Sequence, residues 1–330
     1  MPTTDVHNHV LPTEVIDLLN AEPAYGVSIT EGEWRGVHHV PFKVVPEFYD
    51  ADTKLSRLDD LGIDVAIISP PPVLFFYEKD ADTAAEFCAV NNEGSAKFAA
   101  RNPDRLRWLA NLPMQNPDRA VDAYRSAVAA GCRGAALGTS IAGVRLDEPQ
   151  FERFWAVAAE VGLPVLFHPA FNEPHAALAS WYLQNVIGNL LETTVAVERL
   201  ICAGVLTRHP DLRLVLLHGG GMLPYQMGRL RHAHTVRPEL ADAPIDLAAV
   251  LPRLYFDTIT HDRLALQFLA QQVGERNVVL GTDMPFDMAP ADPMGELRAA
   301  FAPDTLRRVS EENPQRLYGG TTTSLGSIPS

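Results

Sequence analysis

Cysteine is scarce in this chain of 330 residues, which contains only Cys88, Cys132 and Cys202. The three are far apart and form no CxxC pair, so the sequence offers neither a disulfide framework nor a cysteine zinc cluster. This usage is typical of reduced core cysteines. The chain also has no basic segment followed by an apolar one at its start, as a signal peptide would. We therefore expect a cytoplasmic protein.

Basic residues are also few, with 27 Lys and Arg against 41 Asp and Glu, a formal net charge of −14. A surface this acidic repels the phosphates of nucleic acids and anionic lipid headgroups. No apolar run reaches the roughly 20 residues of a transmembrane helix. We expect neither nucleic acid nor membrane as a partner. A small anionic substrate would need a locally positive site, such as a metal ion or a few placed Arg and Lys.

The chain does contain a regular alternation of short apolar runs and longer amphipathic segments. Eight runs are almost continuously hydrophobic, as expected of parallel strands that are covered on both faces. Strand–helix alternation repeated eight times predicts an α/β protein with a (β/α)8 TIM-barrel fold, in a single domain over residues 1–318. The predicted strands are 3–7, 64–69, 107–112, 133–138, 164–168, 213–218, 253–258 and 278–283. The predicted helices are 51–61, 81–101, 117–130, 148–161, 189–208, 223–235, 261–274 and 304–318.

Two segments depart from this alternation. Residues 14–50 predict an insertion after the first strand, with a short helix and a small β-hairpin. Long insertions in a barrel tend to lie over the active site. Residues 319–330 are rich in Gly, Ser and Thr and are predicted to form a flexible tail.

Polar residues at the ends of the predicted strands suggest a metal centre. The first strand ends in His7 and His9, the fifth in His168, the sixth in His218 and the eighth in Asp283. The carboxyl ends of barrel strands share one face, so these side chains are expected to converge. His7 and His9 are two residues apart on a strand and therefore point to the same side. Imidazole and carboxylate groups suit zinc and related divalent metals.

Single histidines at strand ends are more often ordinary polar residues, but four of them with an aspartate favour a metal site. His232 and His234 have the same spacing as the first pair, yet they lie in a helical pattern. Residues two apart on a helix are about 200° apart and cannot share an ion. Asp5 lies on the same face of the first strand as His7, and we expect it to orient a ligand histidine.

The motifs around these residues resemble the amidohydrolase superfamily, in particular the amidohydrolase-2 branch that contains 2-amino-3-carboxymuconate 6-semialdehyde decarboxylase. The resemblance covers nearly the whole chain. The matching segments are Asp5-Val-His-Asn-His-Val-Leu-Pro, Asn111-Leu-Pro-Met-Gln, Val165-Leu-Phe-His-Pro, Glu192-Thr-Thr, His218-Gly-Gly-Gly, Arg237-Pro-Glu-Leu and Gly281-Thr-Asp-Met-Pro-Phe.

This resemblance implies a role for each residue of the site. One Zn²⁺, with Mn²⁺ as the alternative, would be bound by His7, His9, His168 and Asp283. His218 would act as an acid or base next to the metal. Arg237 would reach across a homodimer interface into the neighbouring site and hold a carboxylate of a small-molecule substrate.

The substrate side of the site departs from the pattern of that decarboxylase. A second carboxylate-binding arginine belongs near positions 45–47, where this chain has Val-Pro-Glu, and Lys43 is the nearest cation that could replace it. A Pro-Trp pair of the pattern appears here as Gln184-Asn185. Phe286 and Trp181 are predicted to line the substrate pocket.

The resemblance implies non-oxidative decarboxylation of a small unsaturated or aromatic carboxylic acid. His218 or Asp283 would supply the proton, and histidine suits proton transfer near neutral pH. A shared fold and ligand set do not determine the reaction. A hydrolase or hydratase acting on an ester, amide, lactone or C–C bond is therefore the alternative. A non-catalytic binding protein would need a broken ligand set, and this one is intact.

Overall fold

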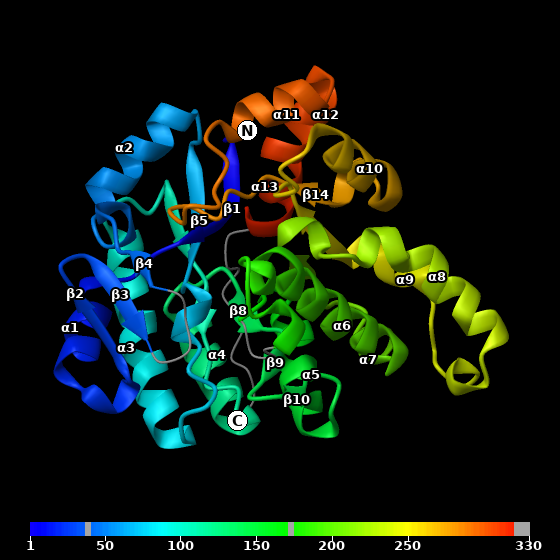
Figure 1. Ribbon diagram of the computed structural model, residues 1–330, viewed down its shortest axis with the longest axis horizontal. Helices are drawn as coiled ribbons and strands as arrows, with labels where there is room; N and C mark the ends of the chain where they lie inside the picture. Colours follow the sequence, from blue (N-terminus) through cyan, green and yellow to red (C-terminus); the bar gives the residue numbers. More distant parts are fainter. Residues whose placement is uncertain (37–40, 171–174, 320–330) are drawn as a thin grey trace.

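The computed structural model describes residues 1–36, 41–170 and 175–319, and its centre is a parallel β-barrel (Figure 1). In this part of the chain the barrel strands are β1 (Thr4–His9), β5 (Val65–Ser69), β6 (Leu106–Trp108), β7 (Ala110–Asn111), β8 (Ala135–Gly138), β11 (Val165–His168), β12 (Leu214–Leu216), β13 (Leu254–Asp257) and β14 (Val278–Val279). Because β6 and β7 are separated only by Leu109, they act as one strand and the barrel has eight. The predicted (β/α)8 fold is confirmed.

Strand pairing follows the order of the chain around the barrel. Strands β1, β5 and β6 pair in that order, and β7, β8, β11, β12, β13 and β14 continue it. The last strand returns to the first because Val6 N–H donates to Leu280 O at 2.9 Å and Asn8 forms a parallel bridge with Met284. All strands therefore end on one face, where barrel enzymes form their sites.

Helices surround the strands (Figure 1). Their bounds are α1 (Thr13–Ala21), α2 (Ala51–Leu61), α3 (Ala81–Ala100), α4 (Pro117–Ala129), α5 (Glu152–Val161), α6 (Asn189–Cys202), α7 (Val205–Arg208), α8 (Leu223–Val236), α9 (Leu247–Val250), α10 (Arg263–Val273), α11 (Pro293–Ala300), α12 (Pro303–Arg307) and α13 (Asn313–Tyr318). The predicted pair His232 and His234 lies in α8, as expected for a helix. No described helix has the length and apolar character needed to cross a membrane.

Several helices begin where the sequence supplies a short acidic or amide side chain. Asp50 accepts from Thr53 N–H at 2.6 Å to cap α2, and Asp262 accepts from Ala265 N–H at 2.8 Å to cap α10. Such caps satisfy backbone donors that the first helical turn leaves unpaired. Gly62 ends α2 in the left-handed conformation, with φ of +69°.

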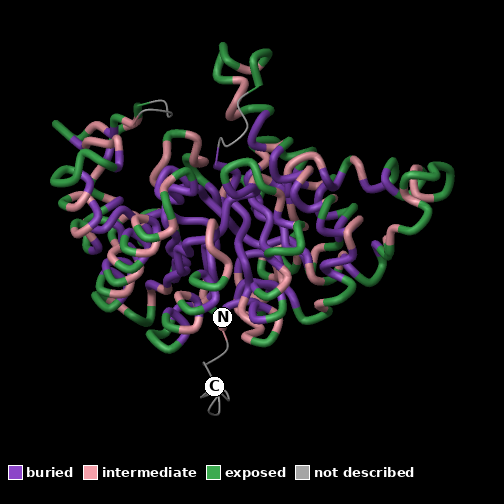
Figure 2. Tube along the Cα trace, turned by 90° about the horizontal axis from the view of Figure 1, so that it is seen from below, coloured by how far each residue is buried: buried purple, intermediate pink, exposed green. Residues whose placement is uncertain are grey.

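The strands form the buried centre of the molecule, which Figure 2 shows in purple inside a partly exposed layer of helices. Residues such as Val6, Ile67, Leu166 and Leu216 on these strands are fully buried. Burial on both strand faces explains why these runs are almost continuously apolar in the sequence.

The insertion after β1 forms a small unit at the barrel rim. It contains α1 and an antiparallel sheet of β2 (Val27–Thr30), β3 (Glu33–Gly36) and β4 (Phe42–Lys43). Its apolar side chains form a second buried cluster, in which Trp34 stacks on Phe42 with ring centroids 5.5 Å apart. Phe42 also packs on Phe286, with ring centroids 5.2 Å apart, so the insertion reaches the end of the barrel where the strands terminate. A second short ribbon, β9 (Ser140–Ile141) with β10 (Val144–Arg145), follows β8.

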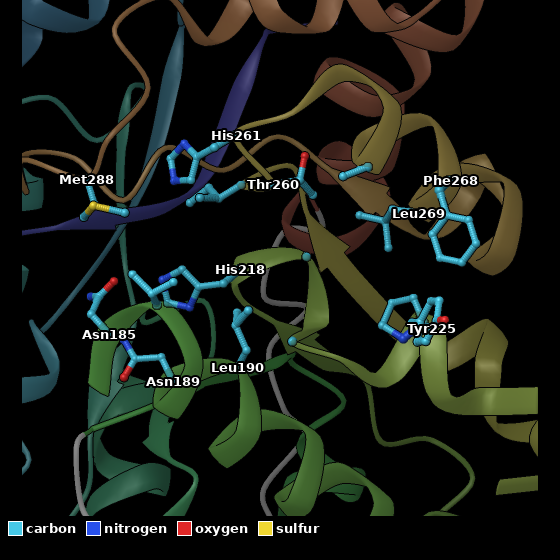
Figure 3. Close-up of a pocket in the computed structure, with 16 residues that line it drawn as sticks. Asn185, Asn189, Leu190, His218, Tyr225, Thr260, His261, Phe268, Leu269 and Met288 are labelled. Carbon is cyan, nitrogen blue, oxygen red and sulfur yellow. The ribbon is translucent and has the colours of Figure 1, made fainter. Parts of the chain in front are cut away.

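A pocket opens at this same end of the barrel, beside the ends of β12 and β13 (Figure 3). The predicted flexible tail, apart from Gly319, lies outside the described residues.

Candidate metal centre

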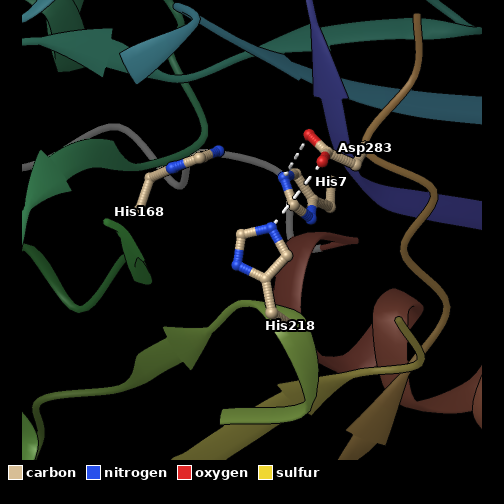
Figure 4. A group of neighbouring side chains, drawn as sticks. All are labelled: His7, His168, His218 and Asp283. Carbon is tan, nitrogen blue, oxygen red and sulfur yellow. Dashed lines mark ion pairs between the residues drawn. The ribbon is translucent and has the colours of Figure 1, made fainter. Parts of the chain in front are cut away.

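The five residues at the strand ends converge at the carboxyl face of the barrel. Nε2 of His7 and Nε2 of His9 are 3.1 Å apart. Oδ1 of Asp283 lies 3.2 Å from the first and 3.0 Å from the second. Possible ligand atoms of His7, His168, His218 and Asp283 all lie within 4.8 Å of one another (Figure 4). All these side chains except His218, which is half-buried, are buried.

Tight turns bring His218 and Asp283 into this group. Both adopt a left-handed backbone, with φ of +55° and +62°, which is unfavourable for residues with a Cβ. The glycines after His218 make its turn possible. A Cβ on Gly220 would lie 2.3 Å from the ring of Phe256, so only glycine fits there.

Hydrogen bonds to Nδ1 orient three of the imidazoles. Nδ1 of His7 lies 2.8 Å from Oδ2 of Asp257, and Nδ1 of His168 lies 2.7 Å from the carbonyl of the next residue. Nδ1 of His9 lies 3.2 Å from the hydroxyl of Ser69, which can donate onward to a backbone carbonyl at 3.3 Å. In each ring Nδ1 is therefore assigned as the donor, and Nε2 keeps its lone pair. The Nε2 atoms of His7, His9 and His168 are therefore free to bind a cation at the point where the five side chains converge.

This donor set fits a divalent metal ion. Nε2 of His168 is buried and has no hydrogen-bond partner among the described residues. The Nε2 lone pairs of His7 and His9 meet at 3.1 Å, which is repulsive unless a cation or a proton lies between them. Atoms that bind one zinc ion at about 2.0–2.2 Å are a little over 3 Å apart. Nε2 of His7, Nε2 of His9 and Oδ1 of Asp283 have about this spacing, with distances of 3.0–3.2 Å.

The electrostatics of the metal-free group favour a single positive charge. Burial lowers the pKa of His7, but Asp283 and Asp257 outweigh it and raise the pKa to about 10. Burial lowers the pKa of His9 to about 4, and burial also holds the pKa of His168 well below its ordinary value. His7 thus carries a second proton, on Nε2, beside the ionised Asp283, and a metal ion would take the place of that proton.

Asp257 is a residue of the candidate site that the sequence analysis missed. Besides His7, it accepts from Gly219 N–H at 2.7 Å and from Ile259 N–H at 3.2 Å. It therefore connects a predicted ligand to the turn that carries His218. The sequence did contain one signal, because Asp257 is a carboxylate that ends an apolar strand at the same face of the barrel.

Asp5, which we expected to orient a ligand imidazole, has a different role. Its carboxylate accepts from the backbone N–H of His7 at 3.0 Å and from the hydroxyl of Thr282 at 2.7 Å. The prediction was wrong about the imidazole, which Asp257 orients instead. Asp5 joins β1 to the segment that carries Asp283.

A buried lysine completes this outer network. Lys54 of α2 is 1% exposed and donates from Nζ to Oδ1 of Asn8 at 2.5 Å. Nδ2 of Asn8 donates in turn to Asp5 at 2.9 Å. Burial lowers the pKa of Lys54 to about 8, although Asp5 and Glu47 oppose this shift. The lysine thus places a positive group behind the first strand.

His218 connects the metal group to the pocket. Its Nε2 lies 3.6 Å from Oδ2 of Asp283, and its Nδ1 is buried without a described partner. The same side chain lines the pocket, a cavity of about 440 Å³. Figure 3 shows its ring facing Asn185 and Asn189 on one side and His261 on the other.

The predicted substrate contacts are scattered more widely. Phe286 packs edge-to-face on His9, with ring centroids 5.2 Å apart. Lys43 is exposed and follows Phe42 on β4, so strand alternation turns it away from the face that packs on Phe286. Trp181 is 88% exposed. Arg237 is exposed just beyond α8 and forms an ion pair with Glu239.

The sequence matches a protein family over nearly its whole length. Residues 4–320 match the family model described as Amidohydrolase. The chain belongs to this amidohydrolase family. It is 28% identical to 2-amino-3-carboxymuconate-6-semialdehyde decarboxylase of Dictyostelium discoideum, over 98% of this chain and 92% of the relative.

Two solved structures are similar in fold to this amidohydrolase. The 5-carboxyvanillate decarboxylase of Sphingomonas paucimobilis has a TM-score of 0.83 at 21% identity, covering 97% of this chain and 99% of that one. A dihydroxybenzoic acid decarboxylase of Polaromonas was solved with bound manganese and the inhibitor 2-nitroresorcinol. It has a TM-score of 0.80 at 22% identity, covering 96% of this chain and 97% of that one.

Proposed function

We propose that this amidohydrolase is a metal-dependent decarboxylase that removes CO2, without oxidation, from a small aromatic or unsaturated carboxylic acid. The observation that carries the proposal is the position of His218, which lies beside Asp283 of the metal group and also lines the pocket. A proton donor between a cation site and an apolar pocket suits the protonation of a carbon atom. The decarboxylase names of the relative and of both similar structures support this choice.

His7, His9, His168 and Asp283 would hold the metal ion. When bound, the ion would act as a Lewis acid that polarises an oxygen of the substrate. We propose Zn²⁺, since histidine and carboxylate ligands suit it, with Mn²⁺ as the alternative. The manganese of the similar Polaromonas enzyme supports that alternative.

In the proposed reaction, His218 gives a proton to the substrate carbon that bears the carboxylate. The carbon–carbon bond to the carboxylate then breaks, its electron pair returns to the unsaturated system, and CO2 leaves. Asp283, 3.6 Å from Nε2 of His218, would stabilise the protonated imidazole before the transfer. Phe286, packed on His9, would contact the substrate ring. Lys43 and Trp181 as substrate contacts stay predictions from the sequence.

We also propose a homodimer in which Arg237 enters the site of the second copy. Exposed apolar side chains lie on α6, α8 and α10, where α8 contacts both of the other helices, and two of them, Tyr225 and Phe268, line the pocket. They are Leu191, Tyr225, Val236, Leu264 and Phe268. An apolar surface of this kind is typical of an interface. Arg237 follows α8, which extends away from the barrel (Figure 1), and its guanidinium suits a carboxylate.

The test is CO2 release by zinc- or manganese-loaded protein from hydroxybenzoates, aminobenzoates and carboxymuconate semialdehydes. We expect release from at least one acid and a loss of about 10²–10⁴-fold in His218→Asn, because a positioned proton donor contributes about that much. Metal content should be unchanged in that variant. His232→Asn, on the exposed surface of α8, is the matched control.

Normal turnover in His218→Asn would remove this residue from the mechanism. If no acid of the panel released CO2 from fully metal-loaded protein, the decarboxylase proposal would fail. Esters, lactones, amides and unsaturated acids would then test hydrolysis and hydration by the same site.

A further inference from the structure

The pocket beside His218 has an uncharged polar wall. Asn185 and Asn189 lie together on this wall, across the cavity from Thr260 and His261 (Figure 3). None of the described residues that line the pocket is a lysine, arginine, aspartate or glutamate. A cavity of about 440 Å³ is large enough for a substituted aromatic ring, and it lies within the usual range for small-molecule sites.

Two polar atoms of the pocket residues lack partners. Oδ1 of Asn189 and Nδ1 of His218 are buried and make no hydrogen bond to the described residues. Asn189 as a whole is only 4% exposed. Buried polar groups in folded proteins nearly always have partners. Because both atoms are closed off from the cavity, a ligand there would reach the Asn189 oxygen only after its carboxamide rotates, and this rotation breaks no hydrogen bond of that oxygen to the described residues. His218 is used by the proposed reaction, whereas Asn189 is not.

The amide pair can recognise only certain chemical groups. A carboxamide offers an oxygen acceptor and two N–H donors, and rotation about its last torsion exchanges the two edges. Asn185 and Asn189 can therefore bind a hydroxyl group, which both donates and accepts. They cannot neutralise a carboxylate, and a buried charge without a partner is strongly disfavoured. The partner subunit's Arg237, proposed above, would hold the reacting carboxylate and leave this wall without a cation.

We propose that Asn185 and Asn189 determine specificity by binding an uncharged hydrogen-bonding group, such as a ring hydroxyl, on the part of the substrate remote from the reacting carboxylate. The pair would reject a substrate with a second carboxylate at that position. This inference rests on the proposed function in placing the reacting carboxylate beside His218 and the metal group. It assigns the opposite end of the substrate to the wall at the start of α6.

The experiment compares ring-matched acids in equilibrium binding to metal-loaded protein by calorimetry. The probes are benzoate, 3- and 4-hydroxybenzoate, and the corresponding 1,3- and 1,4-dicarboxylates. We expect one hydroxybenzoate to bind about tenfold tighter than benzoate and than its dicarboxylate, the effect of one well-formed hydrogen bond. Asn189→Leu should reduce this preference to less than threefold while benzoate still binds. Gln271→Leu, another amide-to-leucine change but on the exposed face of α10, should keep it.

A second variant tests the charge argument in the opposite direction. Asn185→Lys places a cation on the same wall and should shift the preference toward the dicarboxylate by about tenfold. The proposal is overturned if the wild type binds the dicarboxylate as tightly as the hydroxybenzoate, if Asn189→Leu keeps the full preference, or if none of the acids binds. Because CO2 release is assayed separately for each acid, selective binding with no CO2 release would refute the decarboxylase and leave this inference standing.

Discussion

Replacing Asp257 by asparagine removes the orientation of His7 while changing few atoms. The carboxylate accepts three hydrogen bonds, from Nδ1 of His7 at 2.8 Å, Gly219 N–H at 2.7 Å and Ile259 N–H at 3.2 Å. An asparagine has only one acceptor oxygen. If that oxygen keeps the two backbone donors, the NH2 group faces Nδ1 of His7. The imidazole must then accept there, and its proton moves to Nε2, where a metal would bind.

The expected cost follows from these contacts. Loss of a partner that orients a metal ligand lowers metal affinity by about 10–100-fold, which corresponds to about 1.4–2.8 kcal/mol. If the asparagine rotates to keep His7, the two backbone N–H groups lose their acceptor instead, and the free energy of unfolding falls by about 1–3 kcal/mol for each buried donor. Either outcome is measurable.

The assay is zinc and manganese binding in competition with a chromophoric chelator at fixed pH, together with thermal melting of metal-free protein. Asp262→Asn is the control, because Asp262 only caps α10 and asparagine is an equally good cap. Metal affinity within threefold of the wild type, together with an unchanged melting temperature, would refute the role assigned to Asp257.

Two further predictions concern stability. Gly220→Ala should lower the free energy of unfolding by about 2–5 kcal/mol, because its Cβ would collide with Phe256 and its φ of +75° is left-handed. Gly143 has a φ of +84° and no neighbour within 4 Å, so Gly143→Ala should lower the free energy of unfolding by only about 1–2 kcal/mol. Equal melting temperatures of the two variants would contradict the collision. Folding lowers the pKa of Lys54 from an ordinary 10.5 to about 8. Between these two pH values the unfolded chain binds more protons than the folded chain. The free energy of unfolding should therefore rise with pH in this window, relative to that of Lys54→Met. Parallel pH profiles in denaturant titrations would show that Lys54 keeps its ordinary pKa.

Much of the barrel could be predicted from the sequence because parallel strands covered on both faces leave a simple pattern. The apolar runs at Val65–Ser69, Val165–His168 and Leu254–Asp257 stand out since no position on them faces water. Fold topology then implies that the residues after these runs meet on one face. The convergence of His7, His9, His168, His218 and Asp283 could therefore be expected without contact information.

The supporting residues could not be predicted in this way, because their partners are distant in the sequence. Asp257 and His7 are 250 residues apart, and nothing local in either segment indicates that they meet. Asp5, two residues from His7, was the nearer candidate, but its carboxylate contacts the backbone and Thr282. The burial of Lys54 could not be predicted for the same reason, since a lysine on an amphipathic helix is ordinarily exposed.

The sequence by itself determined the order of strands, the identity of the converging histidines and aspartate, and the family, because these depend on local hydrophobic pattern and on motifs. Only the tertiary structure decided which nitrogen of each imidazole is left to bind a metal and which uncharged residues form the pocket wall. Those features depend on the packing of β13 against β12 and of α6 beside the turn of His218. A hydrogen bond requires atoms within about 3 Å of each other, and only the folded chain brings such distant residues that close.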